Sequence, residues 1–391
     1  MLGSDIQIKQ LVGVGDVHLS FQPEQRVYCL IGENGIGKTK CLEALFISYL
    51  VHNTDFLSND YAIFPERHFP FKGYIANLSS KALKPPVGNY FDFENVFLGT
   101  NYHNTPINFV GAQGRGHIRN DNGYSSSNVH DNFDGIGIKE ERKSGYLDRL
   151  IIGIESHGMK DLNMDIDIEK WIIQRARSAN PYQSLEDNRE IEIKTLFDLL
   201  SKIDKRIDSS FLEISGNNRV FIKIADKKTE LSELSSGFAS ILKIMQSIIA
   251  GYSYFTNETN IARVKGVVFI DEIESHLHTK WQATIIPTLK RLFPNTTFYI
   301  TTHSAIVLSQ LQHGEAYELY RDKKDGVVKT ELIEHPNNAA FVDLLKDAFD
   351  IDINRLKLAR DNAPHQKNAK KMLSELLEKR IDELKEGTQS K

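Results

Sequence analysis

The residues of this chain that are best suited to chemistry lie in a glycine-rich stretch near its N-terminus. A glycine, four further residues and then Gly-Lys-Thr match the P-loop pattern of phosphate-binding proteins. Such glycines let successive backbone N–H groups turn toward a phosphate, while the lysine reaches the β- and γ-phosphates and the threonine hydroxyl binds Mg²⁺. The sequence therefore predicts a site for ATP and Mg²⁺. Its residues are Gly32, Asn34, Gly35, Gly37, Lys38 and Thr39.

The segments on either side of this loop support the prediction. The run Arg26–Ile31 is short and rich in strand-forming residues, and Lys40–Leu50 carries apolar residues at helical spacing. Strand, loop and helix thus follow in the order that a P-loop requires, and the positive end of the helix favours the same anion. The alternative is a glycine turn ahead of an ordinary helix, which Gly-Lys-Thr in register after a strand disfavours.

A second candidate site element is an apolar run that ends in two acids. Val267–Ile270 is continuously apolar, which is typical of a parallel strand buried on both faces, and Asp271 and Glu272 follow it. Open α/β sheets bind ligands at the carboxyl ends of their strands. We expect Asp271 to assist Mg²⁺ binding and Glu272 to orient or deprotonate the attacking water. The alternative is a strand that ends in two solvated acids.

Two further segments could complete a nucleotide site. Phe298–Thr301 is another apolar strand, and His303 follows it, so a contact between this histidine and the γ-phosphate is expected if the strand lies beside Val267–Ile270. Ser235 and Gly237 open a predicted helix, where hydroxyl and N–H donors could face an anion. Taken alone, a histidine is more often structural than catalytic, and Ser235 and Gly237 favour an ordinary N-capped core helix.

Together these motifs resemble the ABC-type ATPase heads of the RecF/SMC/OLD-like group, over roughly Met1–Leu50 and Phe211–Tyr320. The resemblance implies that Gly32–Thr39 is Walker A, Leu234–Gly237 the signature, Val267–Glu272 Walker B, Ser275–His278 the D-loop and His303 the switch histidine. Ser236 and Phe238 depart from the familiar Leu-Ser-Gly-Gly-Gln signature, and Phe238 cannot donate a side-chain hydrogen bond.

The Q-loop of such heads has one candidate in this chain. Gln113, in a glycine-flanked turn after a short apolar run, is expected to contact Mg²⁺ or water, although an ordinary loop glutamine fits the pattern equally well. Arg115 or Arg119 could act on a phosphate held by another subunit.

The resemblance also implies an architecture and a role. Two heads would dimerise, or form a higher oligomer, around two ATP molecules, so that Lys38 and Glu272 of one head face Ser235 of the other. The nearest types are the PtuA-like and AriA-like ATPases of bacterial anti-phage systems, which work with a separate nuclease. The alternative is a RecF-like repair clamp that binds duplex DNA. Salt-sensitive duplex binding would favour the clamp, and co-purification with a neighbouring gene product would favour the defence subunit.

The expected fold is an α/β P-loop NTPase of ABC-ATPase type, with a mixed sheet, an inserted helical lobe and a C-terminal helical tail. The predicted divisions are a first head segment (1–52), an inserted lobe with a mobile loop near 111–145 (53–210), a second head segment (211–332) and a C-terminal helical segment (333–391). The last predicted helix, Gln366–Glu386, carries an apolar stripe that could pack on its own head or dock a partner.

Composition limits the other function classes. Charged residues make up 26% of the chain and the formal net charge is −4, which disfavours wholesale coating of nucleic acid but allows a local basic groove. The two cysteines, Cys29 and Cys41, have no metal-site spacing and suit a reducing compartment. No apolar run approaches the roughly 20 residues of a membrane span. We therefore expect a cytoplasmic protein without a membrane partner.

Overall fold

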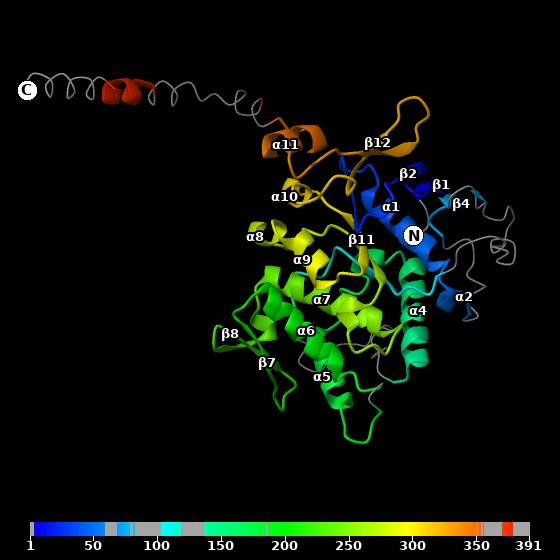
Figure 1. Cartoon of the computed structure of the whole chain (residues 1–391), viewed down its shortest axis with the longest axis vertical. Helices are drawn as coiled ribbons and strands as arrows, with labels where there is room; N and C mark the ends of the chain where they lie inside the picture. Colours follow the sequence, from blue (N-terminus) through cyan, green and yellow to red (C-terminus); the bar gives the residue numbers. More distant parts are fainter. Residues whose placement is uncertain are drawn as a thin grey trace, which may run out of the picture. The chain divides into compact units, whose positions relative to one another are not determined.

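The computed structural model describes residues 4–58, 69–78, 81–82, 103–118, 137–184, 187–349, 351–352, 355 and 370–377 (Figure 1). The chain divides into two units, Met1–Ala339 and Ala340–Lys391. The domain boundaries expected from the sequence within the first unit stay a prediction.

A mixed sheet of ten described strands forms the framework of the first unit. In order across the sheet the strands are β5 (Lys81–Ala82), β4 (Gly73–Leu78), β1 (Asp5–Leu11), β2 (Gly15–Ser20), β13 (Val328–Leu332), β12 (Ala316–Arg321), β3 (Val27–Gly32), β11 (Thr296–Thr301), β10 (Gly266–Ile270) and β6 (Ile107–Val110). The strands from β12 to β6 are parallel, whereas β1 is antiparallel to both β2 and β4. The predicted α/β fold with a mixed sheet is confirmed.

The strands predicted from the sequence take their expected places. The hairpin expected before the P-loop is β1 and β2, and the acid-bearing strand β10 lies directly beside the histidine-bearing strand β11. Every residue of β3 and β10 is buried, because both strands are covered on two faces as their continuous apolar runs indicated. Strand β6, only four residues long, was not predicted as a sheet strand, yet it pairs with β10.

Helices cover the parallel strands and form the lobe. The α-helices among the described residues of the first unit are α1 (Lys38–Leu50), α2 (Thr54–Ser58), α4 (Lys139–Glu155), α5 (Ile168–Ser178), α6 (Glu190–Ile203), α7 (Ser236–Ser253), α8 (Thr279–Gln282), α9 (Ile285–Leu292) and α10 (Ala305–Leu308). Helix α1 packs on β3, β11 and β6, while α7 packs on β6 and on α6. Because α7 contacts both strand β6 and helix α6, it joins the large sheet to the helical lobe.

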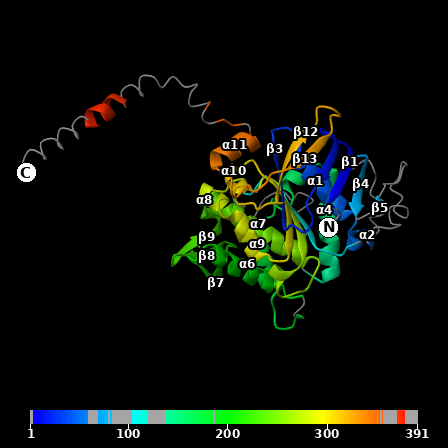
Figure 2. The ribbon, with the colours of Figure 1, turned by 45° about the horizontal axis from the view of Figure 1, so that its top comes forward.

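A second, three-stranded sheet accompanies the lobe. It consists of β7 (Ile207–Ile214), β8 (Val220–Ile224) and β9 (Lys227–Glu230), and the predicted hairpin is confirmed by the pairing of Ile214 with Val220. Helix α6 packs on β7 and α5 packs on β8. In Figures 1 and 2 this sheet lies at the opposite end of the first unit from β1 and β4.

The loop predicted near 111–145 is shorter than expected at its C-terminal end. Helix α4 begins at Lys139, where the sequence analysis still expected loop, because Tyr146, Leu147 and Leu150 form a buried face that stabilises a helix. The glycine- and serine-rich part of that prediction, 119–136, lies outside the described residues.

The second unit contains α11 (Phe341–Phe349) and a helical segment at 370–377. The segment belongs to the predicted helix Gln366–Glu386, whose remaining residues lie outside the described part of the chain, and its side chains Leu373 and Leu376 are exposed. Across the described ranges of both units, no helix is long and apolar enough to cross a membrane.

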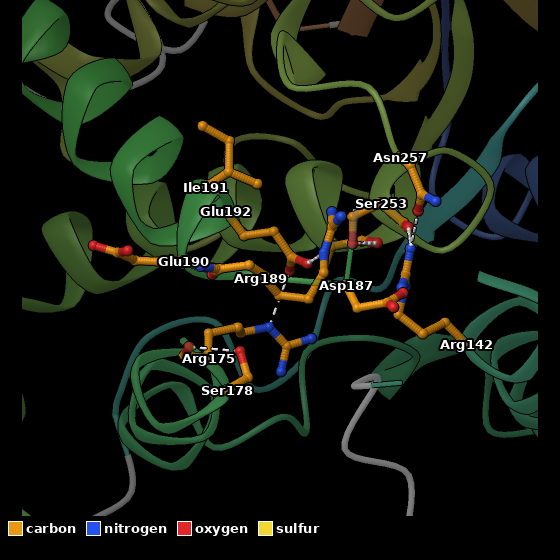
Figure 3. Close-up of polar contacts among 12 residues, drawn as sticks. Arg142, Arg175, Ser178, Asp187, Arg189, Glu190, Ile191, Glu192, Ser253 and Asn257 are labelled. Atoms are coloured by element: carbon orange, nitrogen blue, oxygen red, sulfur yellow. Dashed lines mark hydrogen bonds and ion pairs between the residues drawn. The ribbon is translucent and has the colours of Figure 1, made fainter. Parts of the chain in front are cut away.

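A buried ion-pair cluster holds the lobe together (Figure 3). Glu192 of α6 accepts from Arg175 Nε at 3.0 Å and from Arg189 Nε at 2.7 Å, and all three side chains are at most 1% exposed. Buried Arg142 lies near them and donates to Asn257 Oδ1 at 2.6 Å. Desolvation lowers the pKa of Arg142 to about 10, and the positive charge of Arg189 adds to this.

Glu192→Gln is expected to lower the free energy of unfolding by about 3–5 kcal/mol, because it leaves buried guanidinium groups facing a neutral amide. Urea unfolding followed by circular dichroism measures this loss. The matched control is Glu190→Gln in the same helix, which removes an exposed pair with Lys194 and should cost less than about 1 kcal/mol. Equal effects of the two substitutions would contradict a stabilising role for the cluster.

Candidate nucleotide site

The glycine loop between β3 and α1 adopts a conformation that only glycine tolerates at two positions. Gly32 has φ +141°, and a Cβ there would lie 2.6 Å from the Leu319 carbonyl oxygen of the neighbouring strand. Gly37 has φ +106°, and a Cβ there would lie 2.5 Å from Val14. Both the backbone angles and the close contacts therefore require glycine at these positions. Asn34 and Gly35 lie between them and are exposed.

Lys38 is the first residue of α1 and lies over this loop. Its Nζ donates to the carbonyl oxygens of Gly32 at 2.8 Å and Glu33 at 2.9 Å. Burial lowers the pKa of Lys38, while the nearby carboxylates, first Glu272, act to raise it. The lysine is thus held at the loop by contacts that a bound phosphate could replace.

Asp271 is hydrogen-bonded both to the start of helix α1 and to the end of strand β11. Thr39 Oγ1 donates to its two carboxylate oxygens at 3.0 and 3.1 Å, and Thr301 Oγ1 donates to Oδ1 at 2.7 Å. Burial raises the pKa of Asp271, and the hydrogen bonds from Thr301 and Thr39 oppose that shift. A hydroxyl and a carboxylate at this separation are the oxygen ligands that Mg²⁺ prefers, so the residues fit the predicted ion.

Glu272 is fixed in an uncommon backbone conformation. Its φ is +42°, which a residue with a Cβ rarely adopts, and its N–H donates to Thr301 Oγ1 at 2.7 Å. Ser275 Oγ donates to Glu272 Oε2 at 3.0 Å. Such strained positions often occur at functional sites, where the surrounding contacts maintain them. Here those contacts set the direction of the carboxylate.

A buried arginine, Arg115, stabilises the backbone at the carboxyl end of β10 through hydrogen bonds to its carbonyl oxygens. Its guanidinium donates to the carbonyl oxygens of Gly111 at 2.7 Å, Glu272 at 3.0 Å and Val110 at 3.2 Å, and also to that of Asp271. Desolvation lowers its pKa to about 10. The side chain is 0% exposed, so the hypothesis that Arg115 reaches a phosphate of another subunit is wrong. Arg119, the other candidate for that role, lies outside the described residues.

Arg115→Lys is expected to lower the free energy of unfolding by about 2–4 kcal/mol, because one ammonium cannot reach all four carbonyl oxygens and each orphaned buried group costs about 1–3 kcal/mol. Thermal or urea unfolding measures this loss, and slower ATP hydrolysis should accompany it. If Arg115→Lys unfolded like the wild type, the supporting role assigned to this side chain would be lost.

His303 follows β11 as predicted, and its side chain is exposed. Its backbone N–H donates to Glu274 Oε1 at 2.6 Å, and Thr302 Oγ1 donates to Glu274 Oε2 at 2.6 Å. Glu274 therefore ties the segment after β10 to the segment that carries His303. The catalytic role of His303 stays a prediction.

A cavity of about 340 Å³ brings several predicted site residues together. Thr39, Asp271 and Glu272 line it from the P-loop and β10, and Gln113 lines it from the segment after β6. The side chain of Gln113 is exposed, and its backbone N–H donates to the carbonyl oxygen of Lys160 at 3.0 Å. The candidate metal-binding residues, Thr39, Asp271 and Gln113, thus share one cavity.

The signature segment lies elsewhere on the head. Ser235 is the exposed N-cap of α7, and Ser235 Oγ accepts from the Phe238 N–H at 3.4 Å. Neither Ser235 nor Gly237 is among the described residues that line the cavity. The signature segment packs against the predicted D-loop instead. A Cβ on Gly237 would lie only 3.5 Å from the carbonyl oxygen of His276, which shows how close the two segments are.

Three supporting residues were missed by the sequence analysis: Arg115 as a buried support, Thr301 and Glu274. Thr301 ends an apolar strand and Glu274 lies two residues beyond Glu272, so their positions carried a weak signal. Their partners come from other strands, and only the paired sheet reveals these contacts.

Parts of the chain are similar to known proteins. Residues 136–309 match the family described as "AAA domain, putative AbiEii toxin, Type IV TA system". The Septu protein PtuA of Bacillus thuringiensis is 24% identical over 343 residues, which cover 84% of this chain and 78% of that protein.

Two other relatives match over shorter regions. The Septu protein PtuA of Bacillus mycoides (strain KBAB4) is 28% identical over 39% of this chain and 22% of its own length. The Retron Vc95 probable ATPase of Vibrio cholerae serotype O1 biovar El Tor is 33% identical over 36% of this chain and 28% of its own length. The match thus spans less than a third of each of these two relatives. Residues 136–309 are thus similar to AAA-family ATPase domains, and the chain is similar to the Septu PtuA and retron ATPases.

Proposed function

We propose that this chain hydrolyses ATP at the cavity between the P-loop and the end of β10. Lys38 and the loop N–H groups bind the phosphates, and Glu272 orients or deprotonates the attacking water. Thr39, Asp271 and Gln113 are the residues that would hold Mg²⁺, which supplies charge neutralisation at the β- and γ-phosphates. His303 contacts the γ-phosphate from the neighbouring strand.

The proposed active form is a head-to-head dimer around two ATP molecules. The observation that carries this proposal is the separation of the two motif groups: Ser235 is exposed and lies outside the cavity lined by Thr39, Asp271 and Glu272. Ser235 is therefore free to face the nucleotide of a second copy, whereas Gly237, the next residue of the predicted signature site, is buried. ATP would then hold the two heads together, and hydrolysis would let them separate.

The proposed role is the switch subunit of an anti-phage defence complex. Homology to the Septu PtuA and retron ATPases supports this role, and the dimer supplies the two states that a switch requires. A separate nuclease, encoded by a neighbouring gene, would act as the effector. Opening and closing of the heads would control that partner.

Co-expression with the product of the neighbouring gene tests the complete proposal. We expect stoichiometric co-purification, and light scattering of the ATPase alone should show a larger particle with ATP than without it. A monomer at saturating ATP would contradict the sandwich. Tight, salt-sensitive duplex binding by the ATP-bound form without any protein partner would instead favour a DNA clamp.

A further inference from the structure

A basic groove of about 690 Å³ lies at the junction of the helical lobe and the segment that follows the D-loop. The end of α6, the turn into β7, and helices α8 and α9 form its walls, and these elements lie together in Figure 2. Five of its lining residues are exposed cations: Lys202, Lys205, Arg206, Lys280 and Arg291. We call this feature the basic groove.

The positive charge of this groove is largely uncompensated. Asp204 is the one carboxylate among its described lining residues, and it is engaged by Arg206, whose Nη2 donates to Oδ2 at 2.7 Å. That hydrogen bond is the largest cause that lowers the pKa of Asp204. The chain as a whole has a formal net charge of −4, so five cations around one carboxylate are a local concentration.

A tryptophan lies among these cations. Trp281 is half-buried, and a Cβ on Gly237 would lie 4.0 Å from its Cδ1 atom, so one edge of the indole packs near the signature backbone. The apolar side chains of Ile203 and Pro287 line the same groove. The groove therefore offers a partly accessible aromatic surface surrounded by flexible positive side chains.

We propose that the basic groove binds single-stranded nucleic acid. Proteins that bind single strands combine a positive groove that follows the phosphates with an aromatic side chain on which a base stacks. Lysine and arginine side chains at the rim contact the phosphodiester backbone, and a base stacks on Trp281. This binding is separate from the ATP site, since no residue of the basic groove lines the cavity at Thr39 and Asp271.

The aromatic surface favours a single strand over the two other polyanions that could enter. An acidic protein segment pairs with the cations but has no planar group to stack on the indole. Duplex DNA presents its phosphates but keeps its bases stacked on one another. A single strand uses both features of the groove.

Intrinsic fluorescence gives a direct test, because the chain has two tryptophans and the other, Trp171, is 3% exposed. We expect oligodeoxythymidine of about 20 nucleotides to quench the fluorescence of the full chain, with affinity that falls steeply as salt rises. Trp281→Ala should remove the quenching and weaken binding about tenfold in fluorescence anisotropy. Tyr182→Ala, at an exposed aromatic outside the groove, is the matched control and should change neither quantity.

Charge reversal locates the phosphate contacts. The double substitution Lys202→Glu with Lys280→Glu should weaken oligodeoxythymidine binding by about tenfold or more and reduce the salt dependence. Lys323→Glu with Lys324→Glu changes the net charge equally at exposed lysines outside the groove and should have little effect. The milder pair Lys202→Gln with Lys280→Gln replaces the first double variant if that variant unfolds.

Three outcomes would overturn the proposal. Equal weakening by the groove variant and its control would place the contact elsewhere. Tighter binding of a polyglutamate peptide than of oligodeoxythymidine would assign the groove to an acidic protein segment. Tighter binding of a duplex of the same length would rule out base stacking on Trp281 as the basis of recognition.

Discussion

Glu272→Gln is expected to slow ATP hydrolysis by about 10²–10⁴-fold while ATP binding stays near that of the wild type. The amide keeps the shape of the carboxylate but cannot accept a proton from water. The Ser275 hydroxyl, which donates to Oε2 at 3.0 Å, can still bond to the amide oxygen, and the backbone bonds to Thr301 and Arg115 are unaffected. Single-turnover hydrolysis and calorimetric ATP titration measure the two quantities separately.

The matched control for this substitution is Glu33→Gln. Glu33 is exposed in the P-loop, and its backbone oxygen, not its carboxylate, accepts from Lys38. Glu33→Gln therefore removes one negative charge near the nucleotide without removing the proposed base, and turnover should change little. Wild-type turnover by Glu272→Gln would reject Glu272 as the catalytic residue. An ATP-bound dimer that persists longer in this variant would support the proposed switch.

The main elements of this head could be predicted because each leaves a local signal. Strands β3 and β10 are continuous apolar runs and β11 contains the apolar run Phe298–Ile300, and an apolar strand covered on both faces needs little information beyond its own sequence. The residues expected to act on nucleotide follow these strands directly. Their proximity then follows from parallel pairing, which carries the carboxyl ends of neighbouring strands to one edge of the sheet.

The supporting contacts could not be predicted in this way. Arg115 supports the end of β10 through bonds to carbonyl oxygens more than 150 positions away in the chain, and arginine in a glycine-rich loop is normally exposed. Glu192 meets Arg175 only because helices α5 and α6 pack against each other. Strand β6 is too short to be recognised without its partner β10. In each case the stabilising interaction is long-range.

Ser235→Arg is expected to abolish ATP-dependent dimerisation and hydrolysis while ATP binding stays near wild type. Ser235 is an exposed N-cap whose hydrogen bond to the Phe238 N–H is long, at 3.4 Å, so the fold should lose only about 1 kcal/mol or less. In the proposed dimer, however, Ser235 contacts the γ-phosphate bound by the other subunit, and an arginine is too large to fit there. Light scattering, calorimetry and phosphate release measure the three properties.

Mixing this variant with Lys38→Ala protein tests the shared site itself. Each variant should be inactive alone, because Lys38→Ala cannot bind the phosphates and Ser235→Arg cannot close on them. A mixed dimer has one composite site that is damaged twice and one that keeps Lys38, Glu272 and Ser235 intact. ATPase activity should therefore partly return on mixing. Full activity of Ser235→Arg by itself would reject the assignment of the signature.

Absence of recovery has two physical explanations, and a covalently linked dimer separates them. If hydrolysis requires both composite sites, a linked dimer with Lys38→Ala in one half should be inactive although its second site is intact. If the site is not shared, the same linked dimer should keep about half of the wild-type activity, and a linked dimer with Ser235→Arg in one half should behave in the same way. In the second case, adding Ser235→Arg to the half that lacks Lys38 should cause no further loss. In a shared site, that combination damages the intact composite site, because the remaining Lys38 then faces the altered signature.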